Sequence, residues 1–309
     1  MKTIGVDLWG DQVRGRGANN VTCLRPSTSP RPRKSFRDLF VESYTSFSDR
    51  CREVSEPGIA LVAVDEVTGK SMGLVRLLAR VQRHVAAIIG RHDECDLFLN
   101  AHGRLALRHL AVVLDPVSDW RAGANVRYRV LDLRTTHGFT DECDRALRGL
   151  SAEGPAIIRC AGYVLFVLPL GDPTDWPADP HDAWSILPER VYLRESGPRD
   201  TGMMLALRDV AGVIELAGGI LAIGSDTLHD GLLLGRYLRC DGASYIDDDI
   251  QLSRVHLLLL EVDGTLLAVD TASIHGVRVA GRPPERIAPV PDRAELVLGC
   301  TRLAFTRRA

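Results

Sequence analysis

The sequence predicts an all-β protein with two β-sandwich domains in tandem, preceded by a flexible N-terminal arm. Short apolar runs of four to seven residues, separated by Gly, Asp, Pro or Asn, recur from Ile59 onward, as in Tyr128 to Leu133. A second set of such runs lies between Met203 and Phe305. The length of 309 residues fits about two domains of roughly 150 residues each.

The segments before and between these two sets of runs have a different composition. Between Arg14 and Val54, Lys plus Arg number nine and Asp plus Glu four, mixed with Ser, Thr and Pro. Such a stretch buries too little apolar surface to offset its ordering entropy, apart from a short helix expected near Phe36 to Tyr44. Five prolines between 171 and 202 disfavour regular elements there. We therefore divide the chain into an arm (1–55), a first sandwich (56–170), a Pro-rich linker (171–202) and a second sandwich (203–309).

The two strand-rich halves are similar to one another in sequence. Three landmarks recur in the same order: Gly90-Arg91 as Gly235-Arg236, Leu105–His109 as Leu252–His256, and Thr135–Gly138 as Ser273–Gly276. The recurrences are 145, 147 and 138 residues apart. A constant order with a drifting offset is typical of a duplicated domain whose loops vary in length. We therefore expect the two halves to be copies of one domain.

An ordered set of short motifs runs through the second half: Gly235-Arg236, then Ser253-Arg254-Val255-His256, then His275-Gly276, then a strand that ends at Gly299. This order resembles that of the forkhead-associated (FHA) domain over roughly residues 203 to 307. The resemblance implies a phosphothreonine-binding sandwich in which Arg236 and Ser253 hold the phosphate. It places His275 where the family has an Asn that holds the peptide backbone, and it implies that His256, with Gly235 and Gly276, braces the loops.

The chemistry of these side chains agrees with the resemblance. A planar guanidinium and a hydroxyl on loops of a rigid sandwich suit a phosphate, which carries about −1.5 to −2 charges and several acceptor oxygens. Arg254 either adds charge to this site or is an exposed arginine without a partner. His275 departs from the family pattern, because a ring nitrogen cannot present the paired donor and acceptor of an amide.

The first half keeps only part of the pattern. Arg91, His109 and His137 stand at the matching positions, but the serine is replaced by Ala106. Loss of one hydrogen bond to a charged group costs about 1.5–3 kcal/mol. We therefore expect a degenerate copy that does not bind phosphothreonine and that packs against its twin or against a partner.

Together these features predict a non-catalytic adaptor that binds a phosphorylated protein or a kinase in Ser/Thr kinase signalling. The alternative is a phospho-independent FHA-like scaffold, or an assembly component of a bacterial multiprotein machine. The altered serine and asparagine positions favour that alternative. The chain's own arm is a further partner, if phosphorylated Thr28 or Thr45 folds back into the second site, and homo-oligomerisation stays open.

Other function classes are not expected. The formal net charge is −2, which gives no overall attraction to nucleic acid. We expect a cytoplasmic protein without membrane insertion, because no stretch of 18 apolar residues occurs. The seven cysteines form no CxxC pair, so neither a metal nor a cofactor is expected. The run from Asp247 to Asp249 is interpreted as a solvated loop, and no catalytic arrangement is found.

Overall fold

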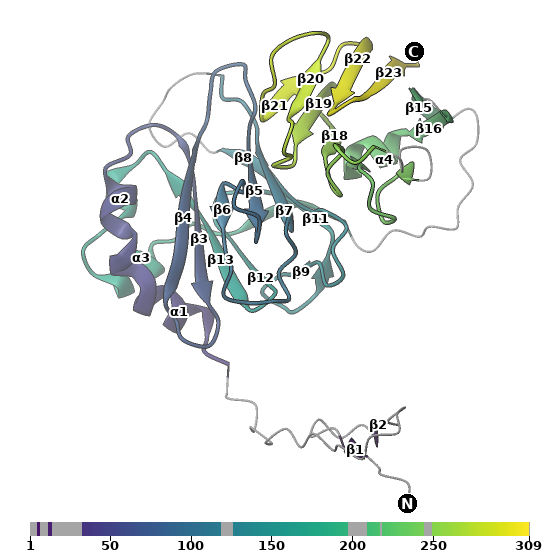
Figure 1. Ribbon diagram of the computed structural model, residues 1–309. Helices are drawn as coiled ribbons and strands as arrows, with labels where there is room; N and C mark the ends of the chain where they lie inside the picture. Colours follow the sequence, from purple (N-terminus) through teal and green to yellow (C-terminus); the bar gives the residue numbers. More distant parts are fainter. Residues whose placement is uncertain are drawn as a thin grey trace, which may run out of the picture. The chain divides into compact units, whose positions relative to one another are not determined.

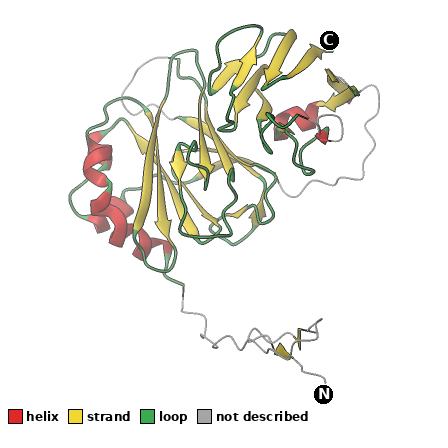
Figure 2. Cartoon of the chain, in the orientation of Figure 1, coloured by secondary structure: helices red, strands yellow, loops and turns green. Residues whose placement is uncertain are grey.

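The computed structural model describes residues 5–6, 12–13, 33–118, 126–196, 209–216, 218–243 and 249–308 (Figure 1). The chain divides into two units, residues 1–34 and 35–309, and each is described by itself. In the first unit, β1 (Gly5–Val6) pairs with β2 (Gln12–Val13). The second unit consists mostly of strands, as Figure 2 shows, so the predicted all-β sandwich class is confirmed.

The first sandwich has two six-stranded sheets, with the strand orders β10-β9-β12-β13-β3-β4 and β14-β11-β8-β7-β5-β6. The strand bounds are β3 Gly58–Asp65, β4 Ser71–Leu78, β5 Val85–Gly90, β6 Leu97–Phe98, β7 Leu110–Leu114, β8 Arg127–Asp132, β9 Phe139–Thr140, β10 Ala146–Leu147, β11 Gly149–Glu153, β12 Ala156–Cys160, β13 Tyr163–Leu170 and β14 Val191–Ser196. Side chains such as Tyr128, Phe139 and Leu165 fill the core between the sheets.

The second sandwich has a five-stranded sheet, β16-β15-β23-β22-β20, and a four-stranded sheet, β17-β18-β19-β21. The element bounds are β15 Val210–Leu216, β16 Gly219–Gly224, α4 Ser225–Asp230, β17 Leu232–Leu234, β18 Leu257–Val262, β19 Thr265–Asp270, β20 Val277–Val279, β21 Ile287–Pro289, β22 Arg293–Leu298 and β23 Thr301–Arg307. Leu259, Leu296 and Phe305 are among the side chains buried between these sheets.

The two sandwiches share a strand order. Taken across the sheet from one hydrogen-bonded neighbour to the next, β9-β12-β13-β3-β4 of the first sandwich corresponds to β20-β22-β23-β15-β16 of the second. In the facing sheets, β11-β8-β7-β5 corresponds to β21-β19-β18-β17. The loops between corresponding strands therefore lie at corresponding ends of each sandwich.

A buried apolar cluster joins the two sandwiches; we call it the seam. From the first sandwich it takes outer-face residues of β5, β7 and β8, such as Ile88, Ala111 and Val113. From the second it takes residues of β18 and β19, such as Leu258 and Leu260. Strands buried on both faces are continuously apolar rather than alternating, which explains the uninterrupted run Leu257–Leu260.

Helices cover the outer face of the sheet that contains β3 and β13, on the side away from the seam. They correct the predicted extent of the arm. The segments are α1 (Phe36–Ser43), η1 (Tyr44–Ser46) and α2 (Ser48–Arg52), and the expected helix near Phe36 to Tyr44 is confirmed. Their apolar side chains pack on β3 and β13, so residues 36–52 belong to the folded unit and not to the predicted flexible arm. The local positive charge concealed this amphipathic pattern, in which Phe40, Tyr44 and Phe47 share one buried face.

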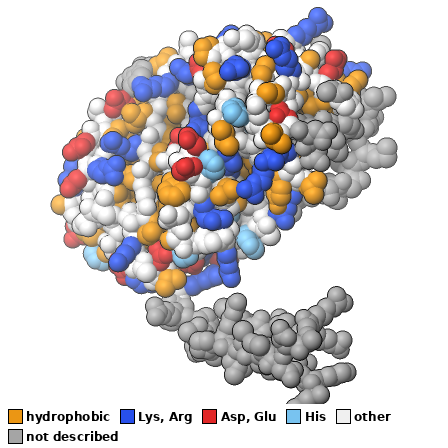
Figure 3. Space-filling model, viewed as in Figure 1, with side chains coloured by type: hydrophobic (Ala, Val, Ile, Leu, Met, Phe, Trp, Pro, Cys, Tyr) orange, Lys and Arg blue, Asp and Glu red, His pale blue; other side chains and the backbone are white. Residues whose placement is uncertain are grey.

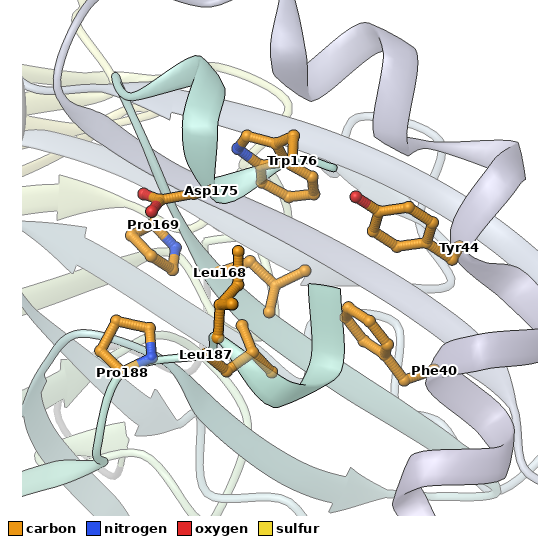
Figure 4. Close-up of a pocket in the computed structure, with 9 residues that line it drawn as sticks. Phe40, Tyr44, Leu168, Pro169, Asp175, Trp176, Leu187 and Pro188 are labelled. Carbon is orange, nitrogen blue, oxygen red and sulfur yellow. The ribbon is translucent and has the colours of Figure 1, made fainter. Parts of the chain in front are cut away.

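The Pro-rich segment is also more regular than predicted. It forms η2 (Pro173–Asp175), α3 (Pro180–Ser185) and β14, and β14 pairs with β11. Proline suits the first turn of a helix because its missing N–H is not needed there, and Asp179 caps α3 by accepting from His181 N at 2.7 Å. Figure 4 shows the pocket between this segment and α1, lined by aromatic and proline side chains such as Phe40, Trp176 and Pro188.

Candidate functional site

Three loops of the second sandwich carry the predicted site residues. We call these loops, residues 235–241, 249–256 and 271–276, the loop cluster. Backbone hydrogen bonds join the first two loops, from Arg236 N to Ser253 O at 3.3 Å and from Tyr237 N to Arg254 O at 2.9 Å. A Cβ atom at Gly235 would lie 2.4 Å from Arg254 O. Glycine is therefore required where the two loops meet.

His256 connects the second loop of the cluster to the third from inside the sandwich. Its buried ring accepts from Ser253 N at Nδ1, 3.0 Å away, and Nε2 lies 3.1 Å from Gly276 O. Because Nδ1 accepts a hydrogen bond from a backbone N–H, the ring proton is on Nε2 and is donated to Gly276 O. Burial lowers the pKa of His256, which favours this neutral ring. Such contacts are those of a bracing residue.

A polar network that the sequence analysis missed shapes the third loop. Ser273 Oγ accepts from Gly276 N at 2.9 Å, and Ser273 N donates to Asp270 Oδ1 at 3.1 Å. Arg286 Nη1 donates to the backbone and side-chain oxygens of Asp270 at 3.0 and 3.1 Å. The signal was present in the sequence, because Asp132 and Thr135 stand at the matching positions of the first half.

The four predicted site residues differ in exposure. Arg236, Arg254 and His275 are exposed, and none of their side chains makes a hydrogen bond or ion pair within the described part of the chain. Ser253 is 6% exposed, and its Oγ accepts from Ile274 N at 3.4 Å. The loops thus bring the four residues to one end of the sandwich, while no hydrogen bond joins their side chains to one another in the described structure.

The matching loops of the first sandwich have the same brace but a different arginine. His109 Nδ1 accepts from Ala106 N at 3.0 Å, and Nε2 lies 3.0 Å from Gly138 O. The half-buried Arg91 side chain donates from Nε to Leu105 O at 2.5 Å. His137 is exposed. The guanidinium of Arg91 therefore bonds to the neighbouring loop of its own sandwich, whereas that of Arg236 makes no such bond in the described structure.

A second repeated motif, Gly-Arg-x-x-x-Cys-Asp, also escaped the sequence analysis. Asp241 Oδ2 accepts from Leu233 N at 3.0 Å, and Asp96 Oδ2 accepts from Ile88 N at 2.8 Å. The buried thiols of Cys240 and Cys95 donate to backbone carbonyls. Burial raises the pKa of Cys240 to about 12 and that of Cys95 to about 11, so both remain protonated thiols that support the loops.

Contacts across the seam tie the loop cluster to the first sandwich. Arg239 Nη1 donates to Thr136 Oγ1 at 2.9 Å. The Arg134 guanidinium forms an ion pair with Asp241 at 2.6 Å. Thr136 precedes His137, so the third loop of the first sandwich lies beside the first loop of the cluster.

Several other predicted features can be located. The described residues contain no group of three or more His, Cys, Asp or Glu side chains that could hold a metal ion, while Asp247 and Asp248 lie outside the described residues. Thr28 also lies outside them, and Thr45 is exposed on η1. No described helix is long and apolar enough to cross a bilayer. On the face drawn in Figure 3, Lys and Arg side chains alternate with acidic and apolar ones.

Comparison with known proteins gives matches only among solved structures, since no family model and no curated protein matches the chain. The chain is similar to Mycobacterium tuberculosis EmbR in complex with a low affinity phosphopeptide, at 16% identity over 32% of this chain and 25% of that chain, with a TM-score of 0.28. It is similar to the FHA domain of CT664 from Chlamydia trachomatis, at 20% identity over 32% and 99% of the two chains, with a TM-score of 0.28. The FHA1 domain of yeast Rad53 gives 17% identity over 32% and 78%, with a TM-score of 0.28.

Proposed function

We propose that the second sandwich is an FHA-like domain that binds a phosphothreonine segment of a partner protein or kinase, and that the chain is a non-catalytic cytoplasmic adaptor in Ser/Thr kinase signalling. The observation that carries this proposal is the state of Arg236. Its guanidinium is exposed and has no side-chain partner among the described residues, while its backbone is bonded to the loop of Ser253. An exposed cation without a counter-ion, on a loop that is hydrogen-bonded to the loop of a hydroxyl, suits a phosphate dianion.

Each residue of the proposed site has a defined role. Arg236 supplies the planar fork of donors, and Arg254 on the neighbouring loop supplies a second positive charge. Ser253 Oγ accepts from Ile274 N, so its hydroxyl proton remains available for a phosphate oxygen. His275 donates one hydrogen bond to the backbone of the bound segment. Each hydrogen bond to the charged phosphate contributes about 1.5–3 kcal/mol.

The first sandwich is, in this proposal, a degenerate tandem copy of the same domain. The shared strand order and the matching histidine braces of His109 and His256 support a duplication. Ala106 lacks the hydroxyl, and Arg91 is engaged with Leu105 O, so two of the phosphate donors are missing or occupied. Its role is to support the second sandwich through the seam.

The proposal is tested by titrating a degenerate phosphothreonine peptide library, and its unphosphorylated counterpart, against the full chain. The variants are Arg236→Ala and, as a matched control, Arg293→Ala, which removes another exposed arginine of the same sandwich. We expect phosphorylation-dependent binding to fall at least about tenfold in Arg236→Ala and to be unchanged in Arg293→Ala. Equal binding by wild type and Arg236→Ala would contradict the proposal.

The second candidate function is a phospho-independent scaffold. It is favoured by the engaged Arg91 and by histidines at both asparagine positions, His137 and His275. Partners retained on the tagged chain after phosphatase treatment of an extract would favour this scaffold, whereas their loss would favour phosphothreonine recognition. Self-occlusion through Thr45 is disfavoured, because Thr45 lies between the buried side chains of Tyr44 and Phe47.

A further inference from the structure

The loop cluster displays apolar side chains as well as charge. The three most exposed large apolar side chains among the described residues are Ile250 at 85%, Leu238 at 84% and Ile274 at 70%. Single exposed apolar residues are ordinary on a protein surface. These three are unusual in their placement, since one lies on each of the three loops that carry Arg236, Ser253 and His275.

The hydrogen bonds of the cluster hold these aliphatic side chains near the proposed phosphate site. Leu238 is two residues after Arg236, on the loop whose Tyr237 N donates to Arg254 O. Ile274 directly precedes His275, and its own N–H donates to Ser253 Oγ at 3.4 Å. Ile250 lies on the same loop as Ser253, three residues before it. The aliphatic and cationic residues are therefore carried by the same hydrogen-bonded set of loops.

The fold does not require aliphatic residues at these positions. Alignment of the two sandwiches on Arg91 with Arg236, on His109 with His256 and on Gly138 with Gly276 places Asp93, Gly103 and Thr136 at the positions of Leu238, Ile250 and Ile274. The first sandwich keeps the same loop contacts with these polar or small residues. The aliphatic side chains are thus a property of the sandwich that retains the serine and the unpaired arginine.

Exposed aliphatic groups around an unpaired cation point to a ligand with matching chemistry. Clustered apolar exposure marks an interaction surface because burial by a partner removes it from water. A purely acidic segment would satisfy Arg236 and Arg254 but would leave three aliphatic side chains uncovered or facing carboxylates. A phosphate with aliphatic neighbours pairs with the arginines and also covers the aliphatic side chains.

We propose that the loop cluster selects phosphothreonine segments with large aliphatic residues beside the phosphothreonine, which contact Leu238, Ile250 and Ile274. This inference rests on the proposed phosphothreonine function and specifies its ligand class. The phosphate supplies the charge that Arg236 requires, and the flanking Leu, Ile or Val residues cover the apolar rim. Selection among phosphorylated partners then comes from the rim and not from the phosphate.

The test compares phosphothreonine peptides with serine at every flanking position against peptides in which leucine replaces serine at one position at a time on either side. Each set is titrated against the full chain, Leu238→Ser and Ile274→Ser. Val191→Ser is the matched control, because Val191 is an apolar side chain of the first sandwich that is 46% exposed. It lies far from the loops: it pairs with Glu153, which in turn pairs with Arg127, and Arg127 is at the end of β8 opposite the loops. The substituted side chains are exposed, so thermal unfolding should match wild type.

We expect leucine at one or more flanking positions to tighten binding about tenfold, and Leu238→Ser or Ile274→Ser to remove that gain while Val191→Ser keeps it. Serine-flanked phosphopeptides should bind all these variants alike, and Arg236→Ala should weaken every phosphopeptide. If wild type binds leucine- and serine-flanked phosphopeptides equally while Arg236→Ala weakens both, the inference is overturned and the proposed function stands. If unphosphorylated leucine peptides bind as tightly as phosphorylated ones, both are overturned.

Discussion

Arg108 of the first sandwich donates from Nε and Nη2 to the backbone carbonyl of Ala272 in the second sandwich, at 3.0 and 2.5 Å. Arg108 is only 6% exposed, and burial lowers its pKa. Ala272 is the second residue of the third loop of the cluster and has a φ of +62°. A side chain of the degenerate sandwich therefore holds the backbone of the proposed binding loop.

Removal of this contact should destabilise the protein. Arg108→Ala leaves the buried carbonyl of Ala272 without its donor and removes the apolar stem of the side chain from the seam. We expect a loss of about 2–4 kcal/mol in the free energy of unfolding, measured by urea denaturation. Arg104→Ala is the control, since Arg104 is exposed on the same loop of the first sandwich and should change stability by less than about 0.5 kcal/mol. Equal effects of the two variants would refute a role for Arg108 in the seam.

A buried carboxyl near the seam should make stability depend on pH. Neither oxygen of Asp115 has a hydrogen-bond partner among the described residues, and His84 Nε2 lies 4.0 Å from Oδ1. Burial raises the pKa of Asp115 to about 6, with Asp263 adding to the rise and Arg129 and Arg127 opposing it. The folded protein therefore holds a proton that the unfolded chain has already released between about pH 4 and 6. The stability contributed by this group falls as the pH rises through that window.

Asp115→Asn should remove this dependence. We expect the variant to be more stable than wild type by about 1–3 kcal/mol at pH 7.5, with little difference below about pH 4, where both states of the wild type are protonated. Urea denaturation across this range measures the effect. Asp292→Asn removes an exposed carboxylate and should leave the pH profile unchanged. A wild-type profile retained by Asp115→Asn would show that another group titrates.

Much of the strand architecture could be predicted from the sequence, because short apolar runs and turn formers reflect local geometry. The motifs around Arg236 and His256 could be aligned with those around Arg91 and His109, because the residue types that form these loops recur in the same order. The helix near Phe36 to Tyr44 could also be predicted, but the packing of residues 36–52 on the first sandwich could not, since it depends on a sheet formed by distant residues. The strand Val191–Ser196 was concealed by the surrounding prolines, although it pairs with β11.

The properties that distinguish the two sites depend on side-chain contacts, which spacing alone does not determine. Arg91 and Arg236 occupy the same place in the repeated motif, yet one guanidinium bonds to Leu105 O and the other remains exposed. The contact of Arg108 with Ala272 joins residues 164 positions apart. Neither could be derived from the motif order.

Gly235 should be intolerant of a side chain, because a Cβ atom there would meet Arg254 O at 2.4 Å. We expect Gly235→Ala to separate the first two loops, to destabilise the fold by about 2 kcal/mol or more, and to weaken phosphothreonine peptide binding. Gly103→Ala is the matched control, since no atom lies within 4 Å of the added Cβ. Stability is measured by thermal unfolding and binding by titration. Unchanged stability in Gly235→Ala would show that the loops can move apart at little cost.

Ala106→Ser tests why the first sandwich does not bind phosphothreonine in the proposed function. The substitution restores a hydroxyl beside the brace formed by Ala106 N and His109. It does not release Arg91, whose guanidinium donates to Leu105 O, so the restored hydroxyl lacks a neighbouring cation that is available to phosphate. In an Arg236→Ala background we therefore expect Ala106→Ser to leave phosphothreonine peptide affinity within about twofold of Arg236→Ala alone, since one donor without the cation supplies little net free energy. If the double variant regains binding, phosphate can draw Arg91 away from Leu105, and the missing hydroxyl alone silences the first sandwich.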